Sequence, residues 1–161
     1  MLKPILCGIG LSAVTVMLHA SGTLWWIQLM RKKYILPFRE MNNEQLQEAF
    51  DFRRSVWILG LTTTLLSSLL VIEVSLWALA YILIPDIDCP QGVEEAFYFS
   101  IVTFTSLGYG DIVIEGPWRI MSGMEAMVGI LVFGWSSALL LTAFLKMLEI
   151  GDPSRSKSGP E

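Results

Sequence analysis

The sequence predicts an all-α membrane protein with three transmembrane helices. Two observations lead to this fold class. The chain of 161 residues is 53% apolar and only 16% charged, with a mean hydropathy of +0.57, which is too apolar for an ordinary soluble domain. It also contains three runs almost free of charge, at residues 4–30, 55–85 and 120–145. About 20 apolar residues cross a bilayer core of about 30 Å, so each run is long enough to span a membrane.

The first run predicts a peripheral transmembrane helix over residues 1–30. A cleaved signal peptide is the alternative, because Lys3 precedes the apolar run and Ala20–Gly22 is a small-residue stretch. The apolar core of a signal peptide is only about 7–15 residues long, whereas this run continues to Met30. We therefore favour a retained helix.

The remaining elements follow in order: a second spanning helix at 55–85, a connecting loop at 86–114 and a third spanning helix at 117–147. Within the loop we expect a short helix over 92–104, because Pro90 and Gly92 break the chain before it. Glu94 and Glu95 suit its first turn, where the helix dipole favours anions. Its C-terminal end would then direct partial negative charge at the segment that follows, which favours a cation there.

The segment after this helix, Thr105–Asp111, holds two glycines, Gly108 and Gly110, that can adopt left-handed dihedrals. A strand that alternates in handedness points successive carbonyls toward one axis. Four copies around that axis would stack rings of carbonyl oxygens, which can replace the hydration shell of a cation. The sequence contains one such segment and no internal repeat, so one chain would supply one quarter of a pore.

The run Thr105-Ser106-Leu107-Gly108-Tyr109-Gly110-Asp111 closely resembles the potassium-channel signature Thr-Val-Gly-Tyr-Gly-Asp. From Phe97 to Asp111 the chain is similar to the pore region of small bacterial potassium channels of the two-transmembrane, pore-loop family, here with an extra N-terminal helix. This resemblance implies an outer helix at 55–85, a re-entrant pore loop at 86–114 and an inner helix at 117–147. The resemblance implies ion ligands in the backbone carbonyls of the filter and in the Ser106 hydroxyl, where the family usually has threonine; Leu107 stands in place of the usual valine. The implied K+-binding residues are Ser106, Leu107, Gly108, Tyr109 and Gly110.

The same resemblance implies a set of residues that support the filter. The Tyr109 side chain should point away from the ions into an aromatic cuff that includes Tyr98 and Phe99, and Asp111 should mark the outer mouth. Glu125 should be buried behind the filter in its protonated form and hydrogen bonded to the pore helix, with pH sensing as the alternative. The predicted supporting residues are Tyr98, Phe99, Thr103, Thr105, Asp111 and Glu125.

Two further polar residues lie within the apolar runs. His19 and Glu73 fall at similar depths if the first two helices are antiparallel, since a rise of 1.5 Å per residue separates them by roughly 5–10 Å. An acidic group in the membrane is costly unless it is paired or faces water. We therefore prefer a structural His19–Glu73 pair to a proton-linked gate.

In the inner helix, Gly129 and Gly134 resemble the hinge region of the family's inner helices, with close helix packing as an equal alternative. Gly116 and Pro117 break the chain before this helix, and Pro117 suits its first turn. By the same alignment, one stripe of the helix should line the cavity and the inner mouth: Ile130, Phe133, Ser137, Leu141 and Leu145.

The loop charges predict the orientation. The outer loop 85–99 has no Lys or Arg, whereas the 31–54 linker is basic, so the positive-inside rule places that linker in the cytoplasm. The N-terminus is then outside and the C-terminus inside. Residues 41–54 favour a surface helix or an extension of the second helix, with a solvated linker as the alternative, and 148–161 is typical of a disordered cytoplasmic tail. The basic linker residues are Arg31, Lys32, Lys33, Arg39, Arg53 and Arg54.

Both cysteines, Cys7 and Cys89, lie near the expected outer face. A disulfide between them and a simple apolar role for Cys7 are both open.

The resulting functional hypothesis is a homotetrameric, potassium-selective channel that conducts K+ passively across a prokaryotic plasma membrane. We expect no cofactor apart from the permeant K+, contact with membrane lipid, and neither nucleic acid nor a small-molecule substrate. No enzyme activity is expected, since no catalytic nucleophile, phosphate loop or metal-ligand cluster is visible. A non-selective cation channel and a non-conducting regulatory subunit of other pore chains are the alternatives. Acidic residues at the outer mouth would concentrate cations: Asp86, Asp88, Glu94, Glu95 and Asp111.

Overall fold

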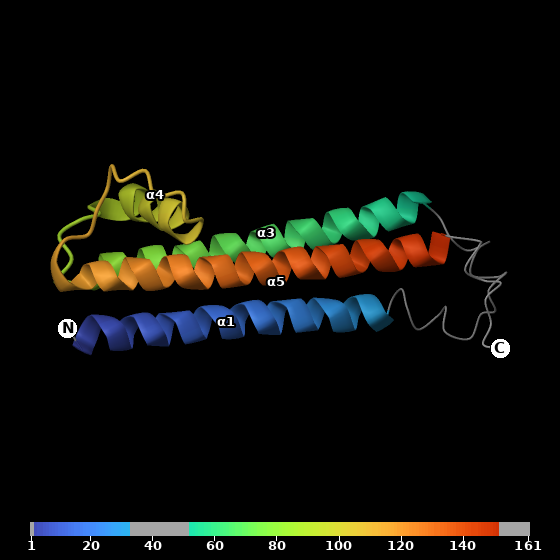
Figure 1. Cartoon of the computed structure of the whole chain (residues 1–161), viewed down its shortest axis with the longest axis horizontal. Helices are drawn as coiled ribbons and strands as arrows, with labels where there is room; N and C mark the ends of the chain where they lie inside the picture. Colours follow the sequence, from blue (N-terminus) through green and yellow to red (C-terminus); the bar gives the residue numbers. More distant parts are fainter. Residues whose placement is uncertain (1, 33–51, 152–161) are drawn as a thin grey trace. The chain divides into compact units, whose positions relative to one another are not determined.

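The structure, a computed structural model, describes residues 2–32 and 52–151, and every regular element in these ranges is helical (Figure 1). Three helices are long and apolar enough to cross a membrane. The predicted all-α membrane fold with three spanning helices is therefore confirmed. The long helices are α1 (Leu2–Met30), α3 (Phe52–Leu83) and α5 (Arg119–Gly151), and between the last two lie α4 (Gly92–Phe104) and a short 3-10 turn, η3 (Gly116–Trp118).

The helix ends differ slightly from the predicted ranges. α3 begins at Phe52 instead of residue 55, so the last residues of the basic linker continue into the helix. α5 begins at Arg119 because Pro117 lies in the 3-10 turn, and it ends at Gly151.

Hydroxyl side chains in the long helices donate hydrogen bonds to their own backbone. The Thr62, Thr63 and Thr64 hydroxyls each donate to the carbonyl four residues earlier, at 2.8–3.0 Å. Ser75 donates to Val71 O at 2.7 Å in the same way. Because a bilayer offers no water to a hydroxyl, this internal bonding makes serine and threonine acceptable in a membrane-spanning helix.

The internal contacts divide the chain into two compact units, which we describe separately. The first unit comprises Met1–Ser21 and Ser67–Trp135, and the second comprises Gly22–Leu66 and Ser136–Glu161. The first unit contains α4 and the loop that follows it, which Figure 1 shows beside the end of α3 and the start of α5.

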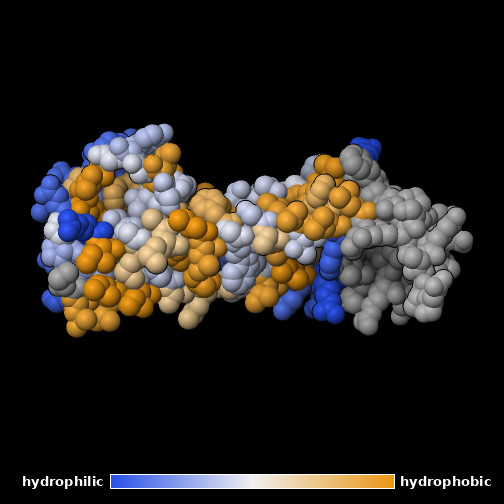
Figure 2. Space-filling view, viewed as in Figure 1, coloured by the Kyte–Doolittle hydropathy of each residue, from blue (hydrophilic) through white to orange (hydrophobic). Residues whose placement is uncertain are grey.

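The core of the first unit lies where α3, α4 and α5 meet. Its largest members are almost fully buried, with Trp77 and Phe104 both 0% exposed and Tyr81 1% exposed. Figure 2 shows hydrophobic residues over much of the helical surface and hydrophilic residues gathered where the loops beside α4 lie. An apolar lateral surface with a polar end is the pattern expected of a protein surrounded by lipid.

Within the first unit, helix α1 packs against α3 and α5 through a face that is partly polar. Thr15 and His19 recur at a four-residue spacing and are 0% and 1% exposed. The Trp77 indole N–H donates to Thr15 Oγ1 at 3.0 Å, which joins α1 to α3. Gly8 lies so close to Met124 that a β-carbon there would meet its sulfur at 2.5 Å, which joins α1 to α5. In the second unit, the Trp26 indole N–H donates to Thr62 Oγ1 at 3.1 Å.

Candidate functional site

Helix α4 occupies the residues predicted for the short helix of the pore loop. Gly92 has a φ of +87°, which only glycine adopts readily, and the helix begins there. The Glu95 carboxylate in its first turn accepts a hydrogen bond from the Gln91 backbone N–H at 2.8 Å. This bond satisfies a backbone donor at the helix start that would otherwise lack a partner.

The loop after α4 alternates in backbone handedness. Thr105 is right-handed, with φ −79° and ψ −3°, whereas Ser106, Gly108 and Gly110 have φ values of +58°, +57° and +78°. Leu107 and Tyr109, which alternate with these three residues, do not have positive φ values. The alternation therefore extends over the whole predicted filter, which is the geometry that turns successive carbonyls to one side.

Backbone hydrogen bonds tie the start of the loop to α4. The Ser106 N–H donates to Thr103 O at 2.9 Å, and Val102 O accepts from both Leu107 N–H at 2.9 Å and Gly108 N–H at 3.2 Å. The Thr105 hydroxyl donates to Ile101 O at 2.7 Å. The position of the filter backbone is therefore fixed by the last turn of α4.

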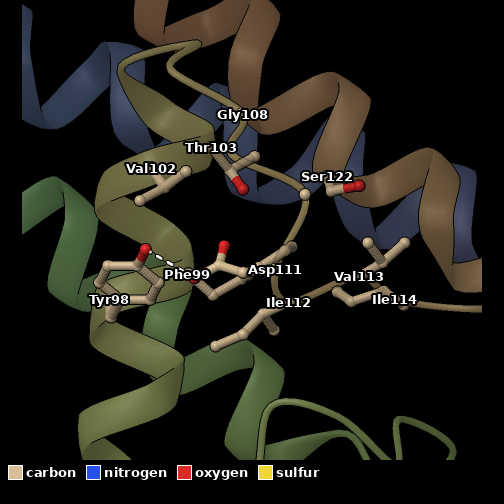
Figure 3. A pocket seen from close by; sticks show the side chains of 11 residues that line it. Tyr98, Phe99, Val102, Thr103, Gly108, Asp111, Ile112, Val113, Ile114 and Ser122 are labelled. Carbon is tan, nitrogen blue, oxygen red and sulfur yellow. Dashed lines mark hydrogen bonds between the residues drawn. The ribbon is translucent and has the colours of Figure 1, made fainter.

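The far end of the filter is held by a second contact to α4. The Tyr98 hydroxyl donates to Asp111 Oδ2 at 2.7 Å, as the dashed line in Figure 3 marks. This hydrogen bond raises the pKa of Tyr98 above its ordinary value of 10.0, so the phenol stays protonated and remains a donor near neutral pH. The filter backbone is thus attached to α4 at both of its ends.

A pocket of about 170 Å³ lies between these two attachments, beside the filter glycines Gly108 and Gly110. Tyr98 and Asp111 lie on one side of it in Figure 3, and Thr103 and Ser122 lie on another. Two side chains of the filter are largely exposed in the single chain, Leu107 at 54% and Tyr109 at 68%. A single chain therefore leaves both the filter and the space behind it open.

The two aromatic residues predicted for the cuff, Tyr98 and Phe99, both line the pocket beside the filter glycines. The Phe99 side chain is only 6% exposed and belongs to the core of the first unit, where its ring lies edge-to-face against Tyr81 at 5.1 Å. Tyr98 is 38% exposed and is the member of the predicted pair that faces outward. Adjacent positions on a helix point about 100° apart, so one of the two aromatic residues faces the core while the other does not.

Glu125 is fully buried in the first unit, at 0% exposure, next to α4. The Tyr81 hydroxyl donates to its Oε2 at 2.7 Å. Ser100, on α4, is a neighbour of the same carboxyl group. The sequence placed Glu125 behind the filter but missed Tyr81 and Ser100. The available signal was that a phenol in an apolar run needs a polar partner when it is buried.

At Gly129, α5 lies in direct contact with the end of α4. A β-carbon at this position would overlap the Phe104 carbonyl oxygen, and Phe104 is the last residue of α4. Gly129 is therefore required for close packing, which was one of its two interpretations. Gly134, by contrast, has no neighbouring atom within 4 Å of such a β-carbon in the described chain.

The residues predicted to line the cavity are exposed on α5 of the single chain. Ile130 is 63% exposed, Leu141 57% and Leu145 50%. Phe133, at 37%, also lies against the Phe104 ring at 6.2 Å, and Ser137 is exposed. Their accessibility permits a role in lining a pore or in contacts between chains.

His19 and Glu73 form a buried pair in the first unit. His19 Nδ1 lies 2.9 Å from Glu73 Oε1, and the two side chains are 1% and 0% exposed. The imidazole also lies edge-to-face against the Trp135 ring, at 6.1 Å, so α1, α3 and α5 meet at this point. The contact agrees with the similar depths expected for the two residues. The structural role of the pair stays a prediction.

Several predictions concern other parts of the chain. Residues 33–51 and 152–161, which hold Lys33, Arg39 and most of the predicted surface helix and tail, lie outside the described residues. Cys7 and Cys89 are free thiols in the structure, and Cys7 packs against the core of the first unit as an apolar residue.

Two comparisons with known proteins give matches. Residues 69–146 match the model of a family described as ion channel. Over 87 residues the chain is 30% identical to the inward rectifier potassium channel Kirbac3.1 of Paramagnetospirillum magnetotacticum. This alignment covers 52% of the chain but only 30% of that relative's length. No solved structure gives a significant match.

Proposed function

Because residues 69–146 match the model of a family described as ion channel, we propose that this membrane protein is a subunit of a potassium-selective channel. The central observation is the alternation of handedness at Ser106, Gly108 and Gly110 within the run that resembles the potassium-channel signature. Carbonyl oxygens aligned in this way can replace the water around a dehydrated cation. A relative with part of its length similar to this chain is a potassium channel by name, which supports the choice of ion.

The K+ ligands in this proposal are the carbonyls of Ser106, Leu107, Gly108 and Tyr109, together with the Ser106 hydroxyl. A left-handed serine is uncommon, because its β-carbon disfavours a positive φ. Such strain persists only where the surrounding structure enforces it, and it concentrates at functional sites. Here the three amide hydrogen bonds to Thr103 O and Val102 O enforce it.

The proposed assembly is a homotetramer. One filter segment cannot encircle an ion, and the exposure of Leu107 and Tyr109 leaves the filter unsupported on one side in a single chain. Neighbouring copies would cover these side chains and the exposed apolar residues of α5. Lipid would cover the remaining apolar surface of the spanning helices.

The orientation follows from the charges. The N-terminus and the pore loop face the outside in this proposal, and the C-terminus faces the cytoplasm. The acidic residues of the loop would then raise the local concentration of cations at the outer mouth. Transport is passive, driven by the K+ gradient.

The test is ion uptake into liposomes that contain the purified protein, measured for Rb+ and Na+ under equal gradients. We expect Rb+ uptake that excess K+ competes for and Ba²⁺ inhibits, with little Na+ uptake. Gly108→Ala should abolish the difference between the ions, because its φ of +57° is strained for any residue with a β-carbon. Gly123→Ala is the matched control, since no atom lies within 4 Å of its β-carbon and its φ is helical.

Equal uptake of Na+ and Rb+ by the unaltered protein would contradict potassium selectivity and favour a non-selective cation channel. Absence of uptake from a demonstrated tetramer would contradict conduction by this chain alone.

A further inference from the structure

Behind the filter, polar side chains from three helices meet in a fully buried cluster. Glu125 of α5, Ser100 of α4 and Tyr81 of α3 are exposed by 0%, 0% and 1%. The Tyr81 hydroxyl donates to Glu125 Oε2 at 2.7 Å. The Tyr81 ring also packs edge-to-face on Phe99 of α4. One tyrosine therefore links α3 to both of the other helices.

Two polar atoms in this cluster have no hydrogen-bond partner, although their side chains are neighbours. Glu125 Oε1 and Ser100 Oγ are both buried and unpaired in the described chain. A buried polar atom without a partner is costly, and a hydrogen bond between the Ser100 hydroxyl and the carboxyl group would remove that cost for both atoms. Such a bond would complete a polar bridge from α3 through α5 to α4.

The contact between α4 and α5 repeats one turn further along both helices. Glu125 and Gly129 are four residues apart on α5, and Ser100 and Phe104 are four residues apart on α4. Residues at this spacing share a helix face. Ser100 faces Glu125, and Phe104 O faces Gly129, so the two helices run in the same direction with their contacts in register.

The filter backbone is attached between these two contacts. Val102 O, which accepts the Leu107 and Gly108 amides, lies between Ser100 and Phe104 on α4. A shift of α4 relative to α5 would therefore move the filter amides and the carbonyls next to them. The polar bridge acts at one end of this segment, and the Gly129 contact acts at the other.

We infer that Glu125 is a positioning residue of the selectivity filter, which it holds through Tyr81 and Ser100 without touching an ion. This inference rests on the proposed function, since it assigns a role in ion discrimination. A residue that only filled space would affect the stability of the tetramer and leave the discrimination between ions unchanged.

The experiment compares four single variants of the full chain, each checked for its tetrameric state and reconstituted in liposomes: Glu125→Ala, Glu125→Gln, Tyr81→Phe and Met127→Ala. Glutamine keeps an acceptor for Tyr81 and supplies a donor for Ser100, so it preserves the bridge. Met127 is the matched control, because it lies on the same turn of α5 but is 73% exposed. The measured quantity is the ratio of Na+ uptake to Rb+ uptake, together with inhibition by Ba²⁺.

We expect Glu125→Ala to raise the ratio of Na+ to Rb+ uptake about tenfold, as the loss of one buried hydrogen bond predicts. For Glu125→Gln and Met127→Ala, the ratio should stay within about twofold of that of the unaltered protein. For Tyr81→Phe, the ratio should lie between those of Glu125→Gln and Glu125→Ala. If Glu125→Ala does not form tetramers, Tyr81→Phe decides the matter, since it removes one hydroxyl and keeps the ring.

An unchanged ratio in a tetrameric Glu125→Ala protein, or in Tyr81→Phe when the alanine variant fails to assemble, would overturn the inference. So would a Glu125→Gln protein with the same loss as Glu125→Ala. These results differ from a failure of the proposed function, in which the unaltered protein itself does not prefer Rb+ to Na+.

Discussion

Gly129→Ala should destabilise the protein more than the same change at Gly123 or Gly134, the other two α5 glycines with known surroundings. The new β-carbon would overlap the Phe104 carbonyl oxygen, which is backbone at the end of α4 and cannot rotate away. Overpacking of a close contact costs about 1–3 kcal/mol, and a backbone obstacle places the cost near the upper limit. Replacement of glycine by alanine within a helix offsets about 1 kcal/mol of this. The expected net loss is about 2 kcal/mol.

The assay is thermal unfolding of the detergent-solubilised protein, followed by circular dichroism, with Rb+ uptake measured in parallel. A loss of about 2 kcal/mol corresponds to a decrease in Tm of about 4–8 °C for a chain of this size. Gly134→Ala is the control, because its β-carbon meets no atom within 4 Å and the change should be neutral or stabilising. If Gly129→Ala were as stable as Gly134→Ala, the close approach of α5 to α4 would be refuted.

Three further predictions follow from single contacts. Tyr98→Phe removes the hydroxyl that donates to Asp111, so the ratio of Na+ to Rb+ uptake should rise. Tyr98→Trp keeps an N–H donor and should retain more of the selectivity. Equal uptake ratios for the two variants would contradict a role of the Tyr98–Asp111 hydrogen bond in holding the filter. Glu73→Leu removes the carboxyl group that lies against His19 Nδ1 and should lower the free energy of unfolding by about 1–3 kcal/mol. The double variant with His19→Leu should recover part of this loss, and a double variant less stable than Glu73→Leu would contradict the pair. Cys7 and Cys89 are free thiols, so reducing agents should leave the Tm unchanged. Both thiols should also react with maleimide once the protein is denatured without a reducing agent. If one or both failed to react, a disulfide would be indicated.

The course of the chain was largely predictable because it depends on signals that are local in the sequence. A run without charge predicts a spanning helix whatever it packs against, and Pro90 with Gly92 marks the start of α4. The left-handed conformations of Gly108 and Gly110 also follow from their lack of a β-carbon. Each of these features needs only a few neighbouring residues.

The features that the sequence did not predict depend on contacts between helices. Tyr81 and Glu125 are 44 positions apart, and the apolar residues around them give no indication of which helix faces meet. Ser106 carries a β-carbon, so nothing in its own type indicates its φ of +58°; the hydrogen bonds to α4 impose it. Phe99 and Tyr98 are both aromatic, and only the rotation of α4 decides which one is buried.

The most direct test of the central claim is the reversal potential of the purified protein in a planar bilayer with K+ on one side and Na+ on the other. Our account predicts a reversal potential set by the K+ gradient, with currents that Ba²⁺ blocks. A reversal potential near zero, with Na+ carried as well as K+, would contradict a filter built by Ser106, Gly108 and Gly110 to select potassium.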